Sequence, residues 1–229
     1  ARGRDRAMKG GETGEEAEGA RCKRGTILLG QGQFGEGRQD VESRRTVRGL
    51  VSENPQWNGS AGEDPVAIVG EQGLGDEVQF LRFLQQAARL RPLRLRFRTA
   101  ELAGLMPGLD QDRILPPEGP VAAEISLLSL PNVLGLGEMP SAEPYLAVRE
   151  TPEADRVGVC WSGNPSYRFD RRRSVPVGCL EILRQVSGAR FVALQPGDAP
   201  DWMERVSLKT PLDLAREVGL CALVISVDT

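Results

Sequence analysis

Apolar positions are grouped in two successive blocks, residues 64–150 and 151–229, that share one pattern. Each block begins with a β-branched run, enters a turn of small residues and continues with apolar residues at helical spacing. Strands are predicted at Val66–Val69, Leu93–Phe97, Arg113–Leu115, Arg156–Trp161, Phe191–Leu194 and Leu223–Val227, and helices at Asp76–Arg89, Ala100–Leu105, Val177–Val186 and Leu212–Gly219. This alternation indicates an α/β protein built on parallel sheets with right-handed crossovers. We expect two Rossmann-like domains that face a shared cleft, the second of them incomplete.

The first 63 residues follow a different pattern. Residues 1–25 are charged, rich in glycine and almost free of large apolar side chains, which predicts a disordered tail. Within residues 26–63, apolar residues from Ile27 to Val41 have a helix-like spacing that resembles a helical repeat, although its glycines disfavour a helix. A polar linker follows, and we expect its Pro55 and Trp57 to pack onto the first α/β domain.

The segment Pro65–Phe80, with the sequence PVAIVGEQGLGDEVQF, is the most informative stretch of the chain. It predicts a buried strand, a glycine turn and a helix start, with Asp76 at or near the N-cap. Glycines let the backbone approach a ligand closely, so this corner is a candidate binding site. A carboxylate at this place can cap the helix, accept a proton from a bound hydroxyl group, or do both. The glycine spacing matches neither a P-loop nor the dinucleotide fingerprint.

Composition narrows the chemistry further. The 229 residues carry a net charge of −3 and no histidine, so a histidine-based zinc site and a Ser-His-Asp triad are excluded within this sequence. The four cysteines show no C-x-x-C spacing, which favours buried, reduced thiols in a cytoplasmic protein. No apolar run is long enough for a membrane span. The sequence begins with Ala1 and stops at Thr229 directly after an apolar strand, so we expect a fragment.

Several motifs together resemble one enzyme family. Five motifs occur in a fixed order along the chain: PQWNGS at Pro55–Ser60, GEQGLGDEVQF at Gly70–Phe80, MPSAEPYL at Met139–Leu146, VCWSGNPSYRFDRRRSVP at Val159–Pro176 and LVISVDT at Leu223–Thr229. They are similar to bacterial tetratricopeptide-repeat-linked glycosyltransferases related to glycosyltransferase family 9, the heptosyltransferase-like group. A weaker match at Ile27–Arg45 resembles the last helical repeat of such proteins.

The resemblance implies a GT-B architecture, in which the first domain binds the acceptor and the second binds the nucleotide-sugar. It implies an inverting, metal-independent sugar transfer with no cofactor, to a carbohydrate, lipid-linked or protein acceptor. Asp76 corresponds to the proposed general base, and the acceptor-side loop contains Glu71, Gln72, Gly73 and Gly75. The predicted contacts to the donor diphosphate are Ser162, Gly163, Asn164, Arg172, Arg173, Ser174, Asp228 and Thr229. Arginine and N–H groups suit a leaving diphosphate.

Other interpretations remain open at the level of the sequence. Asp76 can be only a helix cap, Glu71 is a second candidate base, and Glu77 is expected to be a solvated first-turn acid. The run Arg168–Arg173 can be a solvated loop, and we expect no nucleic acid to bind it because the chain has no wider basic face. Gln195 ends another predicted strand and faces the same predicted cleft, so it is a further candidate contact. The main alternative function is a truncated, non-catalytic relative that binds a protein partner through its repeat-like N-terminus; a nucleotide-binding oxidoreductase is a weaker one.

Overall fold

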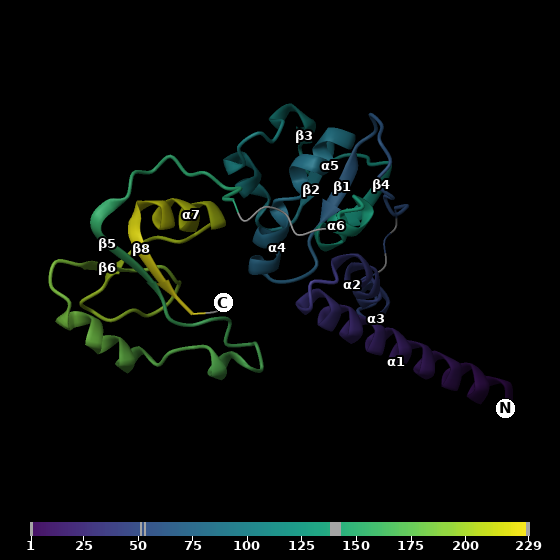
Figure 1. Cartoon of the computed structure of the whole chain (residues 1–229), viewed down its shortest axis with the longest axis horizontal. Helices are drawn as coiled ribbons and strands as arrows, with labels where there is room; N and C mark the ends of the chain where they lie inside the picture. The colour runs from purple at the N-terminus through teal and green to yellow at the C-terminus, as the bar shows by residue number, and fades with distance from the viewer. Residues whose placement is uncertain (1, 51, 53, 138–142, 228–229) are drawn as a thin grey trace. The chain divides into compact units, whose positions relative to one another are not determined.

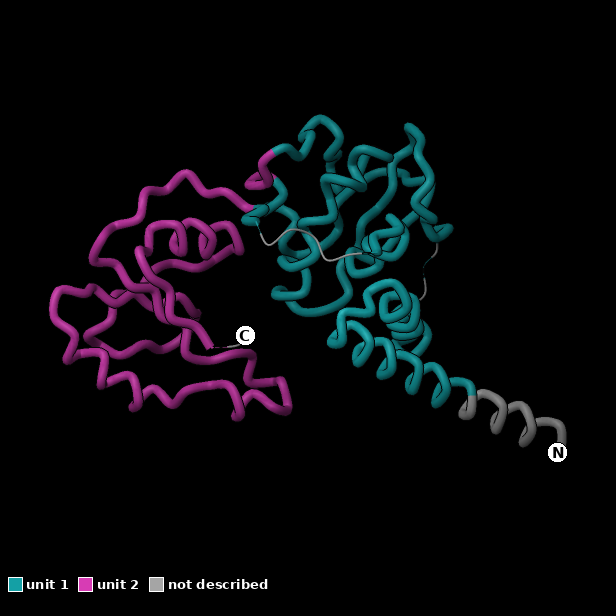
Figure 2. Tube along the Cα trace, in the orientation of Figure 1, with its two compact units in different colours: residues 1–103, 108–145 teal, residues 104–107, 146–229 magenta. Residues whose placement is uncertain are grey.

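Two four-stranded parallel sheets form the framework of the chain, one in each of two units (Figures 1 and 2). The computed structural model describes residues 2–50, 52, 54–137 and 143–227, and side chains from residue 14 onward. Unit 1 comprises Ala1–Ala103 and Gly108–Tyr145, and unit 2 comprises Gly104–Pro107 and Leu146–Thr229. The α/β class and the two parallel sheets are as predicted. The GT-B arrangement and the cleft between the units stay predictions.

The sheet of unit 1 has the strand order β3-β2-β1-β4. Its strands are β1 (Val66–Val69), β2 (Leu93–Arg96), β3 (Ile114–Leu115) and β4 (Ala123–Ser126). In the parallel register Ile68 of the central strand lies between Leu95 and Ile125. Val66, Ala67 and Ile68 are fully buried, which explains why this strand is an unbroken apolar run rather than an alternating one.

Short helices connect these strands. One helix is predicted over Asp76–Arg89, but the structure has two, α4 (Leu74–Leu81) and α5 (Leu84–Leu90). The break falls where Phe83 N–H donates a 3₁₀-type hydrogen bond of 3.1 Å to the Phe80 carbonyl oxygen, and no glycine or proline marks it in the sequence. The remaining helical turns are η1 (Ala100–Leu105), η2 (Gln111–Arg113), η3 (Leu127–Ser129) and α6 (Leu130–Val133).

The linker packs against the sheet of unit 1 as predicted. Trp57 is only 2% exposed, and its backbone N–H donates to the Glu124 carbonyl oxygen at 2.9 Å. The Glu124 N–H in turn donates to the Pro55 carbonyl oxygen at 2.9 Å. This segment therefore adds a short parallel bridge beside β4, at Gln56 and Glu124.

The N-terminal prediction of disorder is wrong for the described backbone. Helix α1 extends over Arg2–Gly30 and is followed by α2 (Phe34–Val41) and α3 (Arg44–Val47). The buried carboxylate of Asp40 accepts hydrogen bonds from Arg21 Nε at 3.1 Å and Arg24 Nε at 2.5 Å. The composition suggests disorder because few residues are apolar, whereas residues 21–25 of α1 are held by long-range ion pairs with Asp40 and by close packing against α2.

The sheet of unit 2 has the order β7-β6-β5-β8. Its strands are β5 (Glu153–Cys160), β6 (Arg190–Ala193), β7 (Glu204–Arg205) and β8 (Cys221–Ser226). Val159, Trp161 and Phe191 belong to a core cluster on this sheet. Strand β5 begins at Glu153, three residues before the start that the sequence predicts at Arg156.

The helical elements of unit 2 agree partly with the prediction. Helix α7 (Pro211–Leu220) begins with a capping box in which Thr210 Oγ accepts from Asp213 N–H and the Asp213 carboxylate accepts from Thr210 N–H. The segment η5 (Val177–Gln185) is a 3₁₀ helix instead of the predicted α-helix, and η4 (Asp170–Arg172) is a single short turn. Across the part of the chain that the structure describes, no helix is both long and apolar enough to cross a bilayer.

Candidate functional site

The glycine corner of unit 1 lies where the strand order of its sheet reverses. The chain leaves β1 toward β2 on one side and returns to β4 on the other, and in open α/β sheets ligands bind beside the carboxyl ends of the strands at such a point. Gly70 is needed here because a Cβ atom would stand 2.7 Å from Glu77 Oε1 and 2.8 Å from Phe97 Cβ. The predicted loop residues Glu71, Gln72 and Gly73 follow directly.

Asp76 lies one turn further along than an N-cap position. Gly73 is the N-cap of α4, and Asp76 at N3 accepts the Gly73 N–H through Oδ2 at 3.0 Å. Gly75 belongs to the first turn of this helix rather than to the loop. Asp76 is half-buried, and the hydrogen bond that its carboxylate accepts within the described part of the chain goes to Oδ2 and not to Oδ1. One carboxylate oxygen therefore orders the helix, and the other remains available to a ligand.

Glu71 is held by an arginine of the helical segment. Arg44 Nε donates to Glu71 Oε1 at 2.5 Å, Arg44 Nη1 to Glu42 Oε1 at 2.9 Å and Arg44 Nη2 to Ser129 Oγ at 2.7 Å. The side chains of Arg44 and Glu71 are only 4% and 3% exposed. This network connects α3, the glycine corner and η3, so Arg44 fills part of the space beside the carboxyl ends of β1 and β4.

The protonation of Glu71 follows from this pairing. Burial acts to raise the pKa of Glu71, but the hydrogen bond and the charge of Arg44 outweigh burial and lower the pKa below its ordinary value. A carboxylate that is stabilised in its charged form is a weak proton acceptor. Its other oxygen, Oε2, is buried without a hydrogen-bond partner among the described atoms. The structure thus gives Glu71 an anchoring role.

Glu77 is not the solvated acid that the sequence predicts. It is 2% exposed; its Oε2 accepts from Thr99 N–H at 3.0 Å, and its Oε1 accepts from Arg98 Nε at 3.3 Å. The carboxylate therefore ties α4 to the segment that follows β2. A polar cavity of about 340 Å³ lies over these strand ends, lined by Gly70, Glu71, Gln72, Glu77, Arg96, Phe97 and Arg98.

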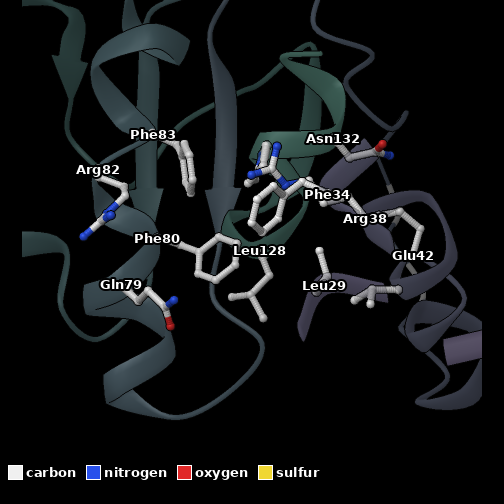
Figure 3. Close-up of a pocket in the computed structure, with 12 residues that line it drawn as sticks. Leu29, Phe34, Arg38, Glu42, Gln79, Phe80, Arg82, Phe83, Leu128 and Asn132 are labelled. Carbon is white, nitrogen blue, oxygen red and sulfur yellow. The ribbon is translucent and has the colours of Figure 1, made fainter. Parts of the chain in front are cut away.

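A second cavity of unit 1, of about 260 Å³, lies between the helical segment and the α/β core. Figure 3 shows Phe34, Phe80 and Phe83 turned toward a common space, with Arg82 directed away from it. Its walls come from α1, α2, α4 and the η3–α6 segment, and are mainly apolar. Local sequence patterns do not indicate this cavity, because its walls come from three segments far apart in the chain, residues 29–42, 79–83 and 128–132.

In unit 2 the corner after β5 brings several predicted donor-site residues together. The backbone N–H groups of Trp161 and Ser162 both donate to Gln195 Oε1, at 2.8 and 3.0 Å. Gln195 Nε2 donates to Ser162 Oγ at 2.9 Å. The carboxamide of Gln195 therefore occupies the place that an anionic oxygen would take between two converging amides.

The next residues of the corner form an internal cluster. Gly163 N–H donates to Ser174 Oγ at 3.0 Å, and Ser174 Oγ donates to Asp170 Oδ2 at 2.7 Å. Arg173 Nε is 3.0 Å from Asp170 Oδ1, so its charge is compensated within the loop. Hydrogen bonds from Ser174 and Arg173 hold the pKa of Asp170 below its usual value. A Cβ atom at Gly163 would stand 2.5 Å from Arg173 Nη2 and 2.6 Å from Asp170 Oδ1, so a larger residue would have to displace this ion pair.

Asn164 and Arg172, which are also predicted donor contacts, have other partners. Asn164 is exposed, and its Oδ1 accepts the Ser166 N–H at 2.9 Å. Arg172 is exposed and its guanidinium carbon lies 5.0 Å from the centre of the Phe169 ring. The arginine run is therefore largely a solvated loop that covers its own aromatic rings. Asp228 and Thr229 lie outside the described residues.

Arg44 and Gln195 each make several hydrogen bonds at these corners. The sequence did not indicate the role of Arg44, and it gave Gln195 only a low rank. Arg44 is one of 29 basic residues, and nothing in its neighbourhood marks it as buried. Gln195 follows a predicted strand, and this position at a carboxyl edge is the signal that could have ranked it higher.

The cysteines follow the prediction only in part. All four are free thiols, but Cys179 is exposed, Cys22 and Cys160 are half-buried, and Cys221 alone of the four is buried. Burial raises the pKa of the Cys160 and Cys221 thiols. Across the described residues, no group of three or more acidic or cysteine side chains is placed to hold a metal ion.

No family model, curated protein or solved structure matches the chain. The similarity to family 9 glycosyltransferases therefore rests on the sequence motifs alone, and the tetratricopeptide repeat and the cytoplasmic location stay predictions as well.

Proposed function

We propose that this protein transfers a sugar from a nucleotide-activated donor to a hydroxyl acceptor, with inversion and without a metal ion. The observation that carries the proposal is the position of Asp76. Its carboxylate follows β1 at the reversal of the strand order, is fixed on one side by the Gly73 amide, and keeps Oδ1 available. These are the requirements for a general base that accepts the acceptor's hydroxyl proton during attack on the sugar.

Glu71 is the weaker of the two candidate bases. Its carboxylate is buried and bonded to Arg44, and its pKa is lowered. Proton transfer to Glu71 would have to break that pairing. We therefore assign Glu71 to holding the corner and Asp76 to the chemistry.

On the donor side, the corner after β5 offers backbone N–H groups at the carboxyl end of a strand that also borders a reversal of strand order. Such groups stabilise the negative charge that develops on a leaving diphosphate. The two halves of the proposed reaction thus fall on equivalent corners of the two units, one acidic and one rich in N–H donors.

Asp76→Asn tests the base. Asn offers an oxygen to the Gly73 amide, so α4 should keep its cap, but it cannot accept a proton at neutral pH. We expect transfer to fall at least about 100-fold, the general magnitude of acid–base catalysis, with unchanged donor affinity. The readout is a transfer assay with UDP-, GDP-, ADP- and CMP-sugars, combined with thermal-shift titration of the same donors.

Asp213→Asn is the matched control. Asp213 also occupies N3 of a capping box, in α7, and accepts the Thr210 N–H at 2.9 Å. It should show a similar small change in stability and full transfer activity. Transfer at the wild-type rate by Asp76→Asn would remove Asp76 from the mechanism.

The second candidate function is a non-catalytic interaction protein that retains the fold. The observation that favours it is the closed state of the donor corner, where Gln195, Ser174 and Asp170 already satisfy the N–H groups and Arg173. Failure of every nucleotide and nucleotide-sugar to shift the unfolding temperature of the folded protein would favour this candidate over the transferase.

A further inference from the structure

The corner after β5 contains an anion site that one neutral side chain keeps closed. Two consecutive backbone N–H groups, of Trp161 and Ser162, converge on a single oxygen atom, Gln195 Oε1. Two N–H groups converging on one oxygen is the arrangement by which backbone amides bind phosphate oxygens. The orientation of the carboxamide is fixed, because only Oε1 can accept from these amides while Nε2 donates to Ser162 Oγ.

We propose that the Trp161 and Ser162 amides bind a diphosphate oxygen and that Gln195 occupies this position until the ligand displaces it. The inference rests on the proposed function for the identity of the ligand. A charged oxygen accepts hydrogen bonds about twice as strongly as a neutral one. A diphosphate can therefore replace a carboxamide at these amides, whereas a carboxylate in the same place would resist replacement.

The structure also provides space for the displaced side chain. Gln195 lines a cavity of about 180 Å³ at the carboxyl ends of β6 and β7, together with Pro196, Gly197, Arg205 and Leu208. Gln195 is half-buried, so its carboxamide can exchange its present partners for water in this cavity. The guanidinium of Arg205 adds positive charge on the same side.

The acidic part of the corner restricts where the anion can sit. Asp170 is paired with Arg173 and hydrogen-bonded to Ser174, which in turn receives the Gly163 N–H. A phosphate oxygen at the Gly163 amide would have to displace Ser174 and approach the Asp170 carboxylate. The Trp161 and Ser162 amides face a neutral group instead, so we place the anion there.

Inorganic pyrophosphate, which carries neither base nor sugar, is the probe for this site. We expect Gln195→Ala, titrated in the full chain by isothermal calorimetry, to bind pyrophosphate at least threefold more tightly than wild type, because no side chain has to leave the amides. We expect Gln195→Glu to bind it at least tenfold more weakly, because a carboxylate holds the amides and repels the ligand. Gln185→Ala and Gln185→Glu, at an exposed position of η5 in the same unit, are the matched controls and should bind as wild type.

The proposal requires that Gln195→Ala and Gln195→Glu change the affinity for pyrophosphate in opposite directions. Equal affinity in wild type, Gln195→Ala and Gln195→Glu would overturn it, as would weaker binding by Gln195→Ala or no pyrophosphate binding by any variant. If Gln195→Ala does not fold, Gln195→Asn replaces it, since its carboxamide is one methylene too short to reach both amides and should also bind more tightly.

The transferase proposal fails separately. If Gln195→Ala binds pyrophosphate more tightly and Gln195→Glu binds it more weakly, but no sugar is transferred, the anion-site proposal stands and the transferase proposal is rejected. If sugar transfer is observed but the affinity for pyrophosphate is the same with and without Gln195, the transferase proposal stands and the anion-site proposal is rejected.

Discussion

At the scale of single residues, each corner contains a cluster of charged side chains that are paired with one another. Arg44 in unit 1 donates to two carboxylates and a hydroxyl, and Asp170 in unit 2 accepts from Ser174 and Arg173. Arg44 and Glu71 form a buried pair, and removing one member would leave an uncompensated charge, which costs more than the pair itself contributes. Such residues therefore fix one conformation of each corner.

The Arg44–Glu71 pair predicts a specific pH dependence. The folded-state pKa of Glu71 is lowered, so its contribution to stability is complete above the ordinary glutamate pKa of about 4.3. That contribution is lost as the pH falls from this value through the folded-state pKa. We expect Glu71→Gln to lose about 1–3 kcal/mol of unfolding free energy at pH 7, and the difference from wild type to shrink progressively as the pH falls below about 4.3.

Urea unfolding at a series of pH values measures this difference. Glu63→Gln is the control in the same unit, because Glu63 is 87% exposed and its ion pair with Arg113 is on the surface; it should change stability by less than about 1 kcal/mol. Parallel pH profiles for wild type and Glu71→Gln would contradict a charged, stabilising Glu71.

At the scale of secondary-structure elements, glycines have opposite roles within the same helix. Gly25 lies where α1 meets α2, and a Cβ atom there would stand 2.7 Å from the Val41 backbone nitrogen. Gly19, on the same helix, has nothing within 4 Å of its ideal Cβ position. The sequence presents both only as weak helix formers, whereas the structure shows that one of them permits close helix packing.

These two glycines make a matched pair of substitutions. Gly19→Ala should stabilise the protein by about 0.5–1 kcal/mol, because alanine reduces the backbone entropy that is lost in a helix. Gly25→Ala should destabilise it by about 1–3 kcal/mol, because backbone atoms of α2 would have to move. Urea unfolding followed by circular dichroism measures both, and equal effects of the two substitutions would contradict the close contact between α1 and α2.

At the scale of the whole molecule, each sheet has a core of its own. Ile68 is fully buried in unit 1, and Val192 is fully buried in unit 2. The tryptophans are divided in the same way, with Trp57 in unit 1 and Trp161 and Trp202 in unit 2. Two separate cores allow two cooperative transitions.

Tryptophan fluorescence can follow each unit separately. In a Trp57→Phe background the remaining tryptophans lie in unit 2, so the emission reports the unfolding of unit 2. Adding Ile68→Ala should leave the urea midpoint of unit 2 unchanged. With Trp161→Phe and Trp202→Phe as background, emission reports unit 1, and Ile68→Ala should remove about 2–5 kcal/mol of its stability. Val192→Ala should show the reverse pattern, with a smaller loss. A single transition that moves in both backgrounds would show that the units unfold as one.

Much of the fold could be predicted because its signals are local. The apolar runs at Val66–Val69 and Phe191–Leu194 and the small-residue turns after β1 and β5 depend on neighbours in the sequence, so strands and corners are predicted to within a few residues. The division of Asp76–Arg89 into two helices and the 3₁₀ form of η5 could not be predicted, because packing rather than propensity selects them.

The sequence by itself determined that two α/β units follow one another, that each begins with a strand and a small-residue corner, and that acidic and arginine side chains stand close to these corners. Only the tertiary structure decided which polar groups meet. Arg44 reaches Glu71 across 27 residues because α3 lies beside the glycine corner, and Gln195 reaches the Ser162 amide across 33 because β6 pairs with β5. Local spacing carries no information about such contacts, since a side chain's partner is set by the elements that the folded sheet brings beside it.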